Sequence, residues 1–533
     1  MADYTTDSMS KLPEQVDITG GKVEHGNTPL NHEPNELPQQ FSLFSTLAFG
    51  FSMTNSWLGY SATFITPLLL GGSPTVFFGL IAASIASCFI TAGLAELASA
   101  YPSSGGQYHF AYMVTPPKYR ALVAFILGWL SVVAWALTSA STALVCAQMV
   151  GNLAGIYHPS YIAEAWQTWM IYSSLILIAT AIIYYLPRAL PRGEMVMFVS
   201  SFLGFIVSFV TVLAMRTNGQ SAKAVFIEYE NNSGWGDGTS FIIGLGTCMY
   251  AYLAIDGACH IAEELPNPGR DIPRAMGLTM LIGILTVIPW TIAFLFSITD
   301  TDAVASSSIP VFTIYLQATR SQPAATVLTV WILFVYFGAL VSCIVTTGRL
   351  AYAFARDGGL PYSEFFVKIH PAHQSPNNAT MGCAAVVVVY GLIYTGSAAA
   401  FNSFISMSIL SLNLTYALPQ AILLIRGRER VLPKRTFALG RHLGPICNAF
   451  SILWVLFITI IFCFPTSIPT TAASMNYVSV IIVGISVLIL VSWWTCKRKT
   501  FFGPTIEIQG LEVALQHHDV SSSTSPARGS GRD

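Results

Sequence analysis

Charged side chains are scarce in this sequence. Only 10% of its 533 residues are Asp, Glu, Lys or Arg, whereas soluble domains carry roughly 25%. The formal net charge is −1, so no overall field favours nucleic acid or an acidic polymer as a partner. Hydrophobic residues make up 53% of the chain and occur in long runs. This composition argues against several soluble domains and indicates one membrane domain with short polar tails.

Motifs for metal, disulfide and phosphate chemistry are also missing. The nine cysteines are scattered without CxxC or Cys/His spacing, so neither a disulfide framework nor a zinc site is expected. No glycine-rich phosphate loop or nucleophile elbow occurs, which argues against an ATP-driven pump and a membrane hydrolase. We therefore predict no cofactor, no metal and no enzymatic activity.

The two ends of the chain are polar. Residues 1–40 mix both charges with prolines and asparagines and contain no signal peptide, and the end of the chain includes a serine-rich stretch. Such segments bury too little apolar surface to fold alone. We predict disordered cytosolic tails at 1–40 and 497–533, on either side of a twelve-helix transporter domain at 41–496.

Twelve apolar runs are long enough to cross a bilayer, whose core of ~30 Å needs roughly 20 helical residues. They lie at about 42–70, 75–100, 121–150, 167–187, 194–215, 239–264, 275–298, 324–350, 380–397, 402–425, 446–464 and 476–496. The sequence thus predicts an all-α, multi-pass integral membrane protein.

The distribution of lysine and arginine gives the orientation. With both termini inside, only Arg216, Lys223 and Arg320 of the 25 basic residues fall in outer loops. An odd number of spans would destroy this alternation. We predict cytosolic termini and, as the commoner destination, the plasma membrane. The sequence Asn231-Asn-Ser in the outer loop between spans five and six makes Asn231 a candidate glycosylation site.

Two spans, five apart, are interrupted by polar and glycine residues. Span one contains the polar stretch from Gly50 to Trp57, and span six contains glycines followed by the stretch from Tyr250 to Gly257. Corresponding broken helices in two halves of a chain point to a transport site near the membrane midplane. The alternative is that the glycines only let helices approach closely.

Asp256 lies in the second interruption, ~12 Å from the inner end of span six at 1.5 Å per residue. An acid at this depth is costly, so it is a functional hypothesis by default. It would neutralise a substrate ammonium or carry a coupling proton. The alternative is that it braces the broken helix.

Other titratable residues near the inner ends of spans are candidates for coupling or gating. His260 lies one turn beyond Asp256 on the same helix face and would share its proton, although a structural role is the commoner one. Glu96 is interpreted as an inner-gate or packing carboxylate. Glu263 and Glu264 would pair with Arg270, Arg274 or Arg349, and such ion pairs would close an inner gate. The alternative is that these residues are solvated charges at the membrane interface.

Three aromatic residues flank the interruptions. Trp57, Tyr250 and Tyr252 would wall a site and stack on a primary or quaternary amine. The alternative is that they pack in the core or face lipid.

Three segments resemble hallmarks of the amino acid–polyamine–organocation (APC) superfamily of permeases. They are GLAELASAYPSSGGQY at 93–108, AEELPNPGRDIPRA at 262–275 and RLAYAFARDGGLP at 349–361. Within this superfamily the chain is most similar to fungal amino acid/choline permeases, which include choline and GABA carriers. That likeness is carried by TNSW at 54–57, IDGACHIAEE at 255–264, AFNS at 400–403 and NYVS at 476–479.

The resemblance implies a LeuT-like fold, in which spans one to five and six to ten form inverted repeats and two helices follow. It also implies a substrate site between broken spans one and six, walled by spans three, eight and ten. By family position the substrate-binding residues are Ser52, Asn55, Ser56, Trp57, Tyr250, Tyr252, Ala254 and Asp256. Proton symport is the family expectation.

Two departures from the family pattern bear on the substrate and the coupling ion. The G-S-G type element of many amino acid permeases is replaced by GFSMTN at 50–55, which leaves room for a substrate without a carboxylate, such as choline. Span five lacks the lysine that some proton-coupled members place near the cation site.

The function that follows is secondary active transport of a small amine-bearing solute such as an amino acid, GABA or choline. A passive channel for small polar solutes is the alternative, since broken helices also line pores. An intramembrane enzyme or a receptor is a more remote one.

Overall fold

The computed structural model describes residues 37–158, 160–216, 218–471 and 475–504. Contacts join the chain from Leu37 onward into one unit. The described residues are helical except for loops and one isolated β-bridge between His370 and Ser375. Most of the two predicted tails, residues 1–36 and 505–533, lies outside the described residues.

The first span is divided into two short helices, as its polar centre predicts. Helix α1 (Leu43–Thr54) and helix α2 (Ser56–Thr63) meet at Asn55, whose φ of 28° lies outside the helical region. The next helix, α3 (Ile65–Ala100), contains a kink where Gly72 has a φ of 67°. A Cβ there would lie 3.3 Å from the Glu230 amide nitrogen, so glycine suits both the angle and the space. The kink separates spans one and two where the sequence predicted.

The sixth span is also divided, into α9 (Asp237–Cys248) and the 3₁₀ helices η2 (Met249–Tyr252) and η3 (Gly257–Glu264). The other spans form the long helices α5 (Arg120–Tyr157), α6 (Ala165–Tyr185), α7 (Leu190–Met215), α10 (Pro268–Ser297), α13 (Gln322–Arg356), α15 (Asn377–Tyr390) with α16 (Ile393–Gly396), α17 (Ala398–Arg426), α19 (Gly440–Ile461) and α20 (Val478–Ser492) with the π-helical turn η4 (Trp493–Lys497).

Among the described residues, 11 helical segments are long and apolar enough to cross a membrane. The 12-residue α1 and the 8-residue α2 are each too short alone. Taken together as one interrupted span, they bring the total to the predicted twelve. Apolar side chains on the outer surface are exposed, among them Leu177, Val210 and Leu285 at 61%, 55% and 61%. Such a surface suits lipid, while the helices satisfy their own backbone groups.

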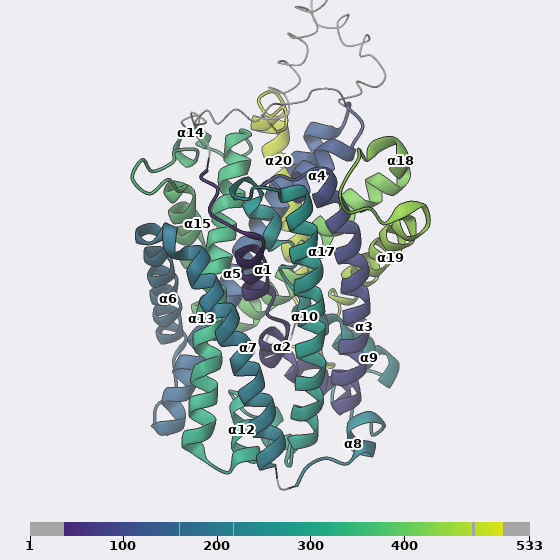
Figure 1. Ribbon diagram of the computed structural model, residues 1–533. Coiled ribbons are helices and arrows are strands. Elements are labelled where there is room, and N and C mark those ends of the chain that lie inside the picture. The colour runs from purple at the N-terminus through teal and green to yellow at the C-terminus, as the bar shows by residue number, and fades with distance from the viewer. Residues whose placement is uncertain (1–36, 159, 217, 472–474, 505–533) are drawn as a thin grey trace, which may run out of the picture. The chain divides into compact units, whose positions relative to one another are not determined.

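The loops predicted on the two sides of the membrane lie at opposite ends of the helices. Helices α4 (Gln107–Val114), α14 (Ser363–Phe366) and α18 (Arg428–Val431) lie at the upper end in Figure 1, and α8 (Ala222–Phe226) and α12 (Pro310–Thr319) at the lower end. Which end faces the cytosol remains a prediction from the lysine and arginine distribution.

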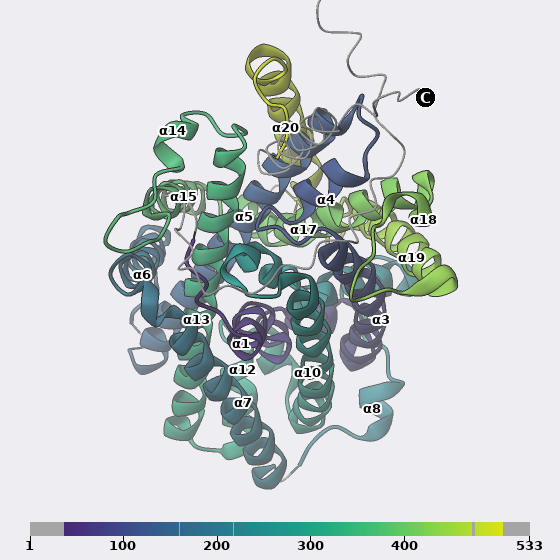
Figure 2. The ribbon, with the colours of Figure 1, turned by 45° about the horizontal axis from the view of Figure 1, so that its top comes forward.

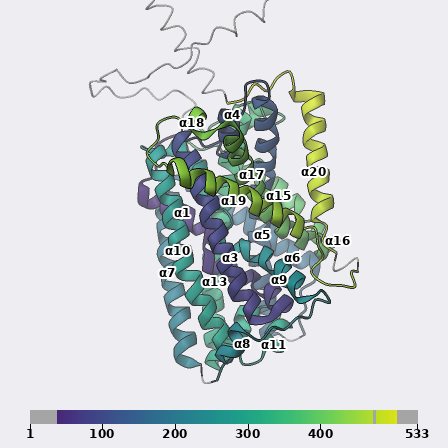
Figure 3. The same ribbon diagram turned by 90° about the vertical axis from the view of Figure 1, so that its right-hand side faces the viewer.

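Helix α1 is packed among other helices, and its residues from Ser45 to Thr54 are buried. It contacts α7, α10 and α13, which surround it in Figure 2. Helix α20, yellow in Figure 3, stands at the edge and contacts α5 and α17. The broken first span is therefore enclosed by protein, as irregular backbone at membrane depth requires.

Candidate substrate and coupling site

The break in span one exposes polar groups inside the bundle. The Asn55 amide still donates to the Phe51 carbonyl (2.7 Å), and the helix restarts at Ser56 without a side-chain cap. Among the described residues, Ser52 Oγ, Thr54 Oγ1 and Ser56 Oγ are buried without a hydrogen-bond partner. Buried hydroxyls without partners are uncommon, and their grouping at one helix break indicates a site for a polar ligand or water.

The break in span six lies where the sequence predicted it. After η2, Leu253 is extended and Ala254 has a φ of 66°, a left-handed angle that is unusual for alanine. Such strain is concentrated at functional sites, where the surrounding structure holds it in place.

A small cavity lies between the two breaks. Its volume is about 20 Å³, roughly the space of one water molecule, so the site is closed around any larger solute. Helices α1 and α2, the η2 region, α5 and α13 enclose it. Its lining residues are Met53, Thr54, Asn55, Leu58, Gly59, Thr138, Thr142, Tyr250, Leu253, Tyr336 and Ala339.

Two of the predicted substrate-binding residues, Asn55 and Tyr250, line this cavity. The Tyr250 hydroxyl bonds to Ser141 of α5 (2.8 Å). Tyr252 projects elsewhere, because its hydroxyl bonds to Ser84 of α3 (2.6 Å). Ala254 contributes the unusual backbone angle at the break and is not among the lining residues.

Trp57 lies in an aromatic cluster beside the cavity. Its ring is 6.2 Å from Trp290 and 6.3 Å from Phe205, measured between centroids. Its indole Nε1 donates to Ser201 Oγ (3.1 Å), and Ser201 donates in turn to Asn55 Oδ1 (2.9 Å). Ser201, on α7, was not predicted. Ser201 holds the Asn55 side chain at the helix break through a hydrogen bond that no local sequence pattern predicts.

The carboxylate of Asp256 is fully buried and receives hydrogen bonds from four side chains. Gln107 Nε2 and Trp135 Nε1 donate to Oδ2 at 2.7 and 3.2 Å. His260 Nε2 lies 3.0 Å from the same oxygen, and the Tyr416 hydroxyl donates to Oδ1 at 2.5 Å. These donors come from α4, α5, η3 and α17. Asp256 is thus the junction of four elements and does not line the cavity.

The two ring nitrogens of His260 each face an oxygen acceptor. Its Nδ1 lies 3.0 Å from the Ser104 carbonyl, which only accepts, so Nδ1 carries a hydrogen. Its Nε2 faces the Asp256 carboxylate, and that contact also needs a hydrogen. A hydrogen on both ring nitrogens, or on the carboxylate, would satisfy these two contacts. Without this second hydrogen, a nitrogen lone pair would face the carboxylate.

Gly106 makes this arrangement possible. It has a φ of 58°, and a Cβ at this position would lie 2.8 Å from His260 Cε1. Only glycine combines that angle with so close an approach. The glycine pair in the motif at 93–108 thus lets the chain place the Ser104 carbonyl against His260 and the Gln107 amide against Asp256.

Two ion pairs connect η3 to α13. Glu264 accepts from Arg349 Nε at 2.6 Å, and both side chains are buried. Glu263 forms a two-pronged pair with Arg356, at 2.8 Å for each contact. The Glu264–Arg349 contact is one of those predicted, whereas the partner of Glu263 was not.

The predicted alternative partners of these glutamates lie elsewhere. Arg270 pairs with its neighbour Asp271 (2.9 Å). Arg274 forms no ion pair with another described residue. Charge alone could not choose among four nearby arginines, because the choice depends on how η3 is rotated against α13.

Glu96, at the end of α3, is buried and holds two arginines. Arg428 forms an ion pair with Oε2, and Arg435 contacts Oε1 at 2.5 Å. The Leu439 amide also donates to Oε1 (3.1 Å). Glu96 therefore ties α3 to the segment between α17 and α19, and its role as a gate remains a proposal.

A buried carboxylate that sequence reasoning missed is Glu194, near the start of α7. Both of its oxygens accept from the Ser342 hydroxyl of α13, at 2.8 and 2.9 Å. Ser52 of α1 approaches the same carboxylate without forming a well-oriented hydrogen bond. Glu194 forms no ion pair with a described residue. An acidic residue within a predicted span is itself a signal of function, and this signal could have identified Glu194 from the sequence.

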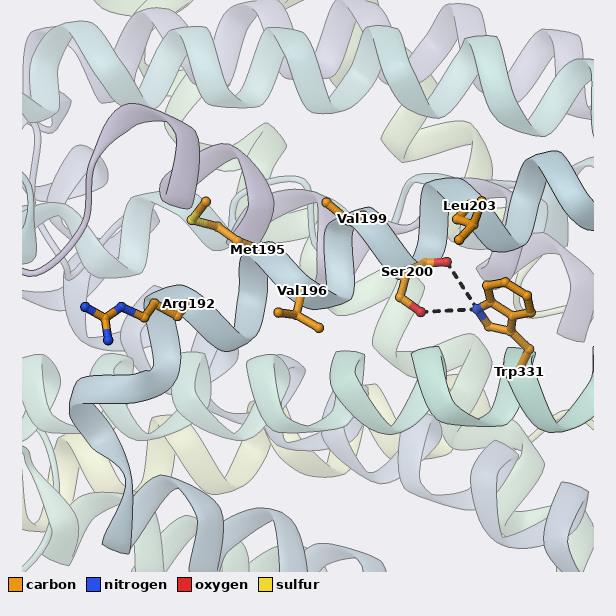
Figure 4. Close-up of a pocket in the computed structure, with 7 residues that line it drawn as sticks. All are labelled: Arg192, Met195, Val196, Val199, Ser200, Leu203 and Trp331. Atoms are coloured by element: carbon orange, nitrogen blue, oxygen red, sulfur yellow. Dashed lines mark hydrogen bonds between the residues drawn. The ribbon is translucent and has the colours of Figure 1, made fainter.

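A separate groove lies between α7 and α13 (Figure 4). Apart from Arg192 and Ser200 its lining is apolar, and Trp331 Nε1 donates to the Ser200 carbonyl and hydroxyl at 3.2 and 3.1 Å. Its residues include the exposed Val196 and Val199, so it belongs to the apolar outer surface and not to the site between the breaks.

The candidate glycosylation residue Asn231 is held within its own loop. Its Nδ2 donates to the Trp235 carbonyl (2.6 Å) and to Asp237 Oδ1 (3.0 Å). Glycosylation would require these bonds to be given up, and it stays a prediction.

Comparisons with known proteins agree with this architecture. The model of the amino acid permease family matches residues 41–487. The chain is 35% identical to the choline transporter of Saccharomyces cerevisiae, over 94% of this chain and 87% of that protein. It is 29% identical to the transmembrane transporter swnT of Metarhizium robertsii (89% and 94% covered) and 27% identical to the amino-acid permease BAT1 of Arabidopsis thaliana (89% and 94%).

The chain is thus a multi-pass membrane transport protein, and it belongs to the amino acid permease family. The relatives' names describe transporters and permeases, not enzymes.

Proposed function

We propose that this protein is a proton-coupled secondary transporter of a small amine-bearing solute, with choline as the first candidate. The observation that carries the proposal is the cavity between the two helix breaks, next to a buried carboxylate–imidazole pair. In this proposal the cavity binds the solute and the pair binds the coupling proton.

The chemistry of the cavity favours a quaternary amine. Its lining contains no charged side chain, and it includes the rings of Tyr250 and Tyr336. A trimethylammonium group donates no conventional hydrogen bond, so aromatic faces and neutral oxygens are suitable partners. The similarity to a choline transporter supports the same substrate.

An amino acid or GABA is the second candidate, favoured by the uncapped start of α2. Helix α2 begins at Ser56 without a side-chain cap. Backbone amides at a broken helix start suit a substrate carboxylate. A zwitterionic substrate would then place its amine among the tyrosines.

Coupling would follow from a proton shared by Asp256 and His260. Loss of that proton would leave a lone pair of His260 facing Asp256 Oδ2, and so weaken the contact between η3 and the carboxylate. The same carboxylate is held by the donors Gln107, Trp135 and Tyr416. Since these donors lie on three other elements, a local charge change would alter packing across the bundle. Proton release would in this way favour the opening of one side.

The ion pairs Glu264–Arg349 and Glu263–Arg356 are the proposed inner gate. They bind η3 to α13 beside the cavity's predicted cytosolic exit. Alternating access would break these pairs on opening inward. The outer side would be closed by the cluster of Trp57, Phe205 and Trp290.

The test is uptake of labelled choline, GABA and several amino acids in a permease-deficient host, across a range of pH. We expect saturable choline uptake that accumulates solute against its gradient and responds to the proton gradient. Accumulation of an amino acid but not choline would select the second candidate. Uptake that only equilibrates the solute would contradict active transport and favour a channel.

The aromatic part of the site is tested by Tyr250→Leu, with Tyr252→Leu as the matched control. If choline is the substrate, Tyr250→Leu should weaken binding by about 1–2 kcal/mol, or roughly 5- to 30-fold in half-saturation constant. Tyr252→Leu should have a smaller effect, because that ring points toward Ser84. Equal effects of the two variants would count against the proposed cage.

A further inference from the structure

An open basic cavity lies at the end of the bundle that carries α4 and α18. It has a volume of about 660 Å³ and is lined by residues from the end of α17, from α18 and its flanking loops, and from the start of α19. Five basic side chains and one acidic side chain line it: Arg428, Arg430, Lys434, Arg435, Arg441 and Glu429. Its volume is within the usual range for small-ligand sites, roughly 300–1,000 Å³.

Two of the arginines form the floor of the cavity. Arg428 is buried, and both it and Arg435 pair with Glu96 beneath them. Arg428 also donates to Asn448 Oδ1 at 3.0 Å. The floor is thus held rigidly by contacts with α3 and α19, which fixes two guanidinium groups in a cavity wall.

The other three basic side chains are free to bind a ligand. Arg430, Lys434 and Arg441 are exposed and form no ion pair with another described residue. Counting Glu96 and Glu429 against all five cations leaves three positive charges uncompensated among these side chains. The N-terminal turn of the 22-residue α19 begins at the cavity and adds to the positive potential.

We propose that this cavity binds a phosphate group, presented by the headgroup of an anionic phospholipid or by a free phosphate. Guanidinium forks match phosphate oxygens in pairs, and several cations around one cavity suit a multiply charged anion. The cavity joins the ends of two membrane spans, where basic side chains on the predicted cytosolic side meet anionic lipid. A bisphosphorylated inositol lipid is the headgroup that the charge and volume favour.

The proposed site would also connect lipid composition with the bundle. A phosphate bound at Arg435 competes with Glu96, and Glu96 ties α3 to this segment. Occupancy would therefore alter how α3 is held at its end. This role is separate from substrate binding, because the basic cavity and the cavity between the two helix breaks share no lining residue.

The test uses the full chain and a triple variant, Arg430→Gln with Lys434→Gln and Arg441→Gln. These side chains are exposed and unpaired among the described residues, so the variant should fold. The matched control is Arg188→Gln with Lys368→Gln and Lys499→Gln. It removes the same charge from exposed positions on the same predicted side, outside the cavity.

The lipid arm measures lipid retention by native mass spectrometry after reconstitution into phosphatidylcholine with or without phosphatidylinositol bisphosphate. At about fivefold for each basic contact, we expect binding to weaken on the order of a hundredfold in the triple variant and to be unchanged in the control. A second arm titrates detergent-purified protein with inorganic phosphate, with chloride at equal ionic strength, and follows thermal unfolding.

The two arms separate the sources of the phosphate. Selective loss of lipid retention in the triple variant supports a headgroup site. Protection by inorganic phosphate that the triple variant loses supports a site for a free anion. If the triple variant and the control behave alike in both arms, or if wild type binds neither probe, the proposed site is wrong.

Discussion

Replacing Asp256 by Asn preserves the size of the side chain but removes a negative charge and one acceptor oxygen. The carboxylate now accepts from Gln107, Trp135, His260 and Tyr416. An amide oxygen in the Oδ2 position would keep the first two bonds, and the amide nitrogen would face the Tyr416 hydroxyl, which can turn to accept.

The substitution leaves His260 without a protonation state that suits both of its ring nitrogens. If it holds a hydrogen on both nitrogens, it becomes a buried cation without a counter-charge. If it holds one hydrogen while the amide oxygen occupies the Oδ2 position, a lone pair of His260 must face either the Ser104 carbonyl or the amide oxygen. If the amide is turned round, its nitrogen takes the Oδ2 position, and a hydrogen on His260 Nε2 would then face a second donor. A buried unsatisfied group costs about 1–3 kcal/mol, and removing one partner of a buried pair costs about 3–5 kcal/mol. We expect a loss of about 2–4 kcal/mol in stability.

The assay combines uptake with thermal unfolding of the purified protein. Asp256→Asn should reach the membrane and still exchange labelled solute across it, because Asp256 does not line the cavity. It should no longer accumulate solute against a gradient, and its uptake should lose its dependence on pH. The double variant Asp256→Asn with His260→Gln should be more stable than the sum of the two single changes predicts, by about 1 kcal/mol or more.

Two results would refute this reasoning. Accumulation at the wild-type level with an unchanged pH profile would remove Asp256 from coupling. Loss of exchange without loss of stability would instead place the carboxylate in direct contact with the substrate.

Three further predictions follow from the ionisable residues. Glu264→Gln should cost about 3–5 kcal/mol of stability, because it leaves Arg349 buried without its carboxylate; near-normal unfolding would show that the pair is not closed in the membrane. Glu194→Gln should cost less than about 1.5 kcal/mol, because the amide keeps an acceptor for Ser342 and leaves no ion pair broken; a loss as large as that of Glu264→Gln would reveal a missing partner. Burial lowers the pKa of His109, in α4, from 6.5 to about 4, so its contribution to stability is complete above pH 6.5 and is lost as the pH falls toward 4. His109→Gln should therefore remove up to about 3 kcal/mol of this acid sensitivity, and an unchanged pH profile of unfolding would contradict it.

Much of the fold was predictable because hydrocarbon permits few alternatives. A span must be an apolar helix of about 20 residues, so apolar runs of that length can be recognised in the sequence as spans. The same rule made the polar stretch at 50–57 and the acid at Asp256 conspicuous. The break at Asn55 and the separation of spans one and two at Gly72 follow from residues that tolerate non-helical backbone.

What the sequence by itself determined is the number of spans, the position of the two breaks and the presence of a buried acid, since each depends on residues close together in the chain. Only the tertiary structure decided which side chains meet that acid. Gln107, Trp135 and Tyr416 are 149, 121 and 160 residues away from Asp256, and their approach depends on helix rotation and packing. The same packing turned Tyr252 toward Ser84 and brought Glu263 to Arg356. Periodicity tells which residues share a helix face, but the neighbour of that face is set by how the whole bundle fills space.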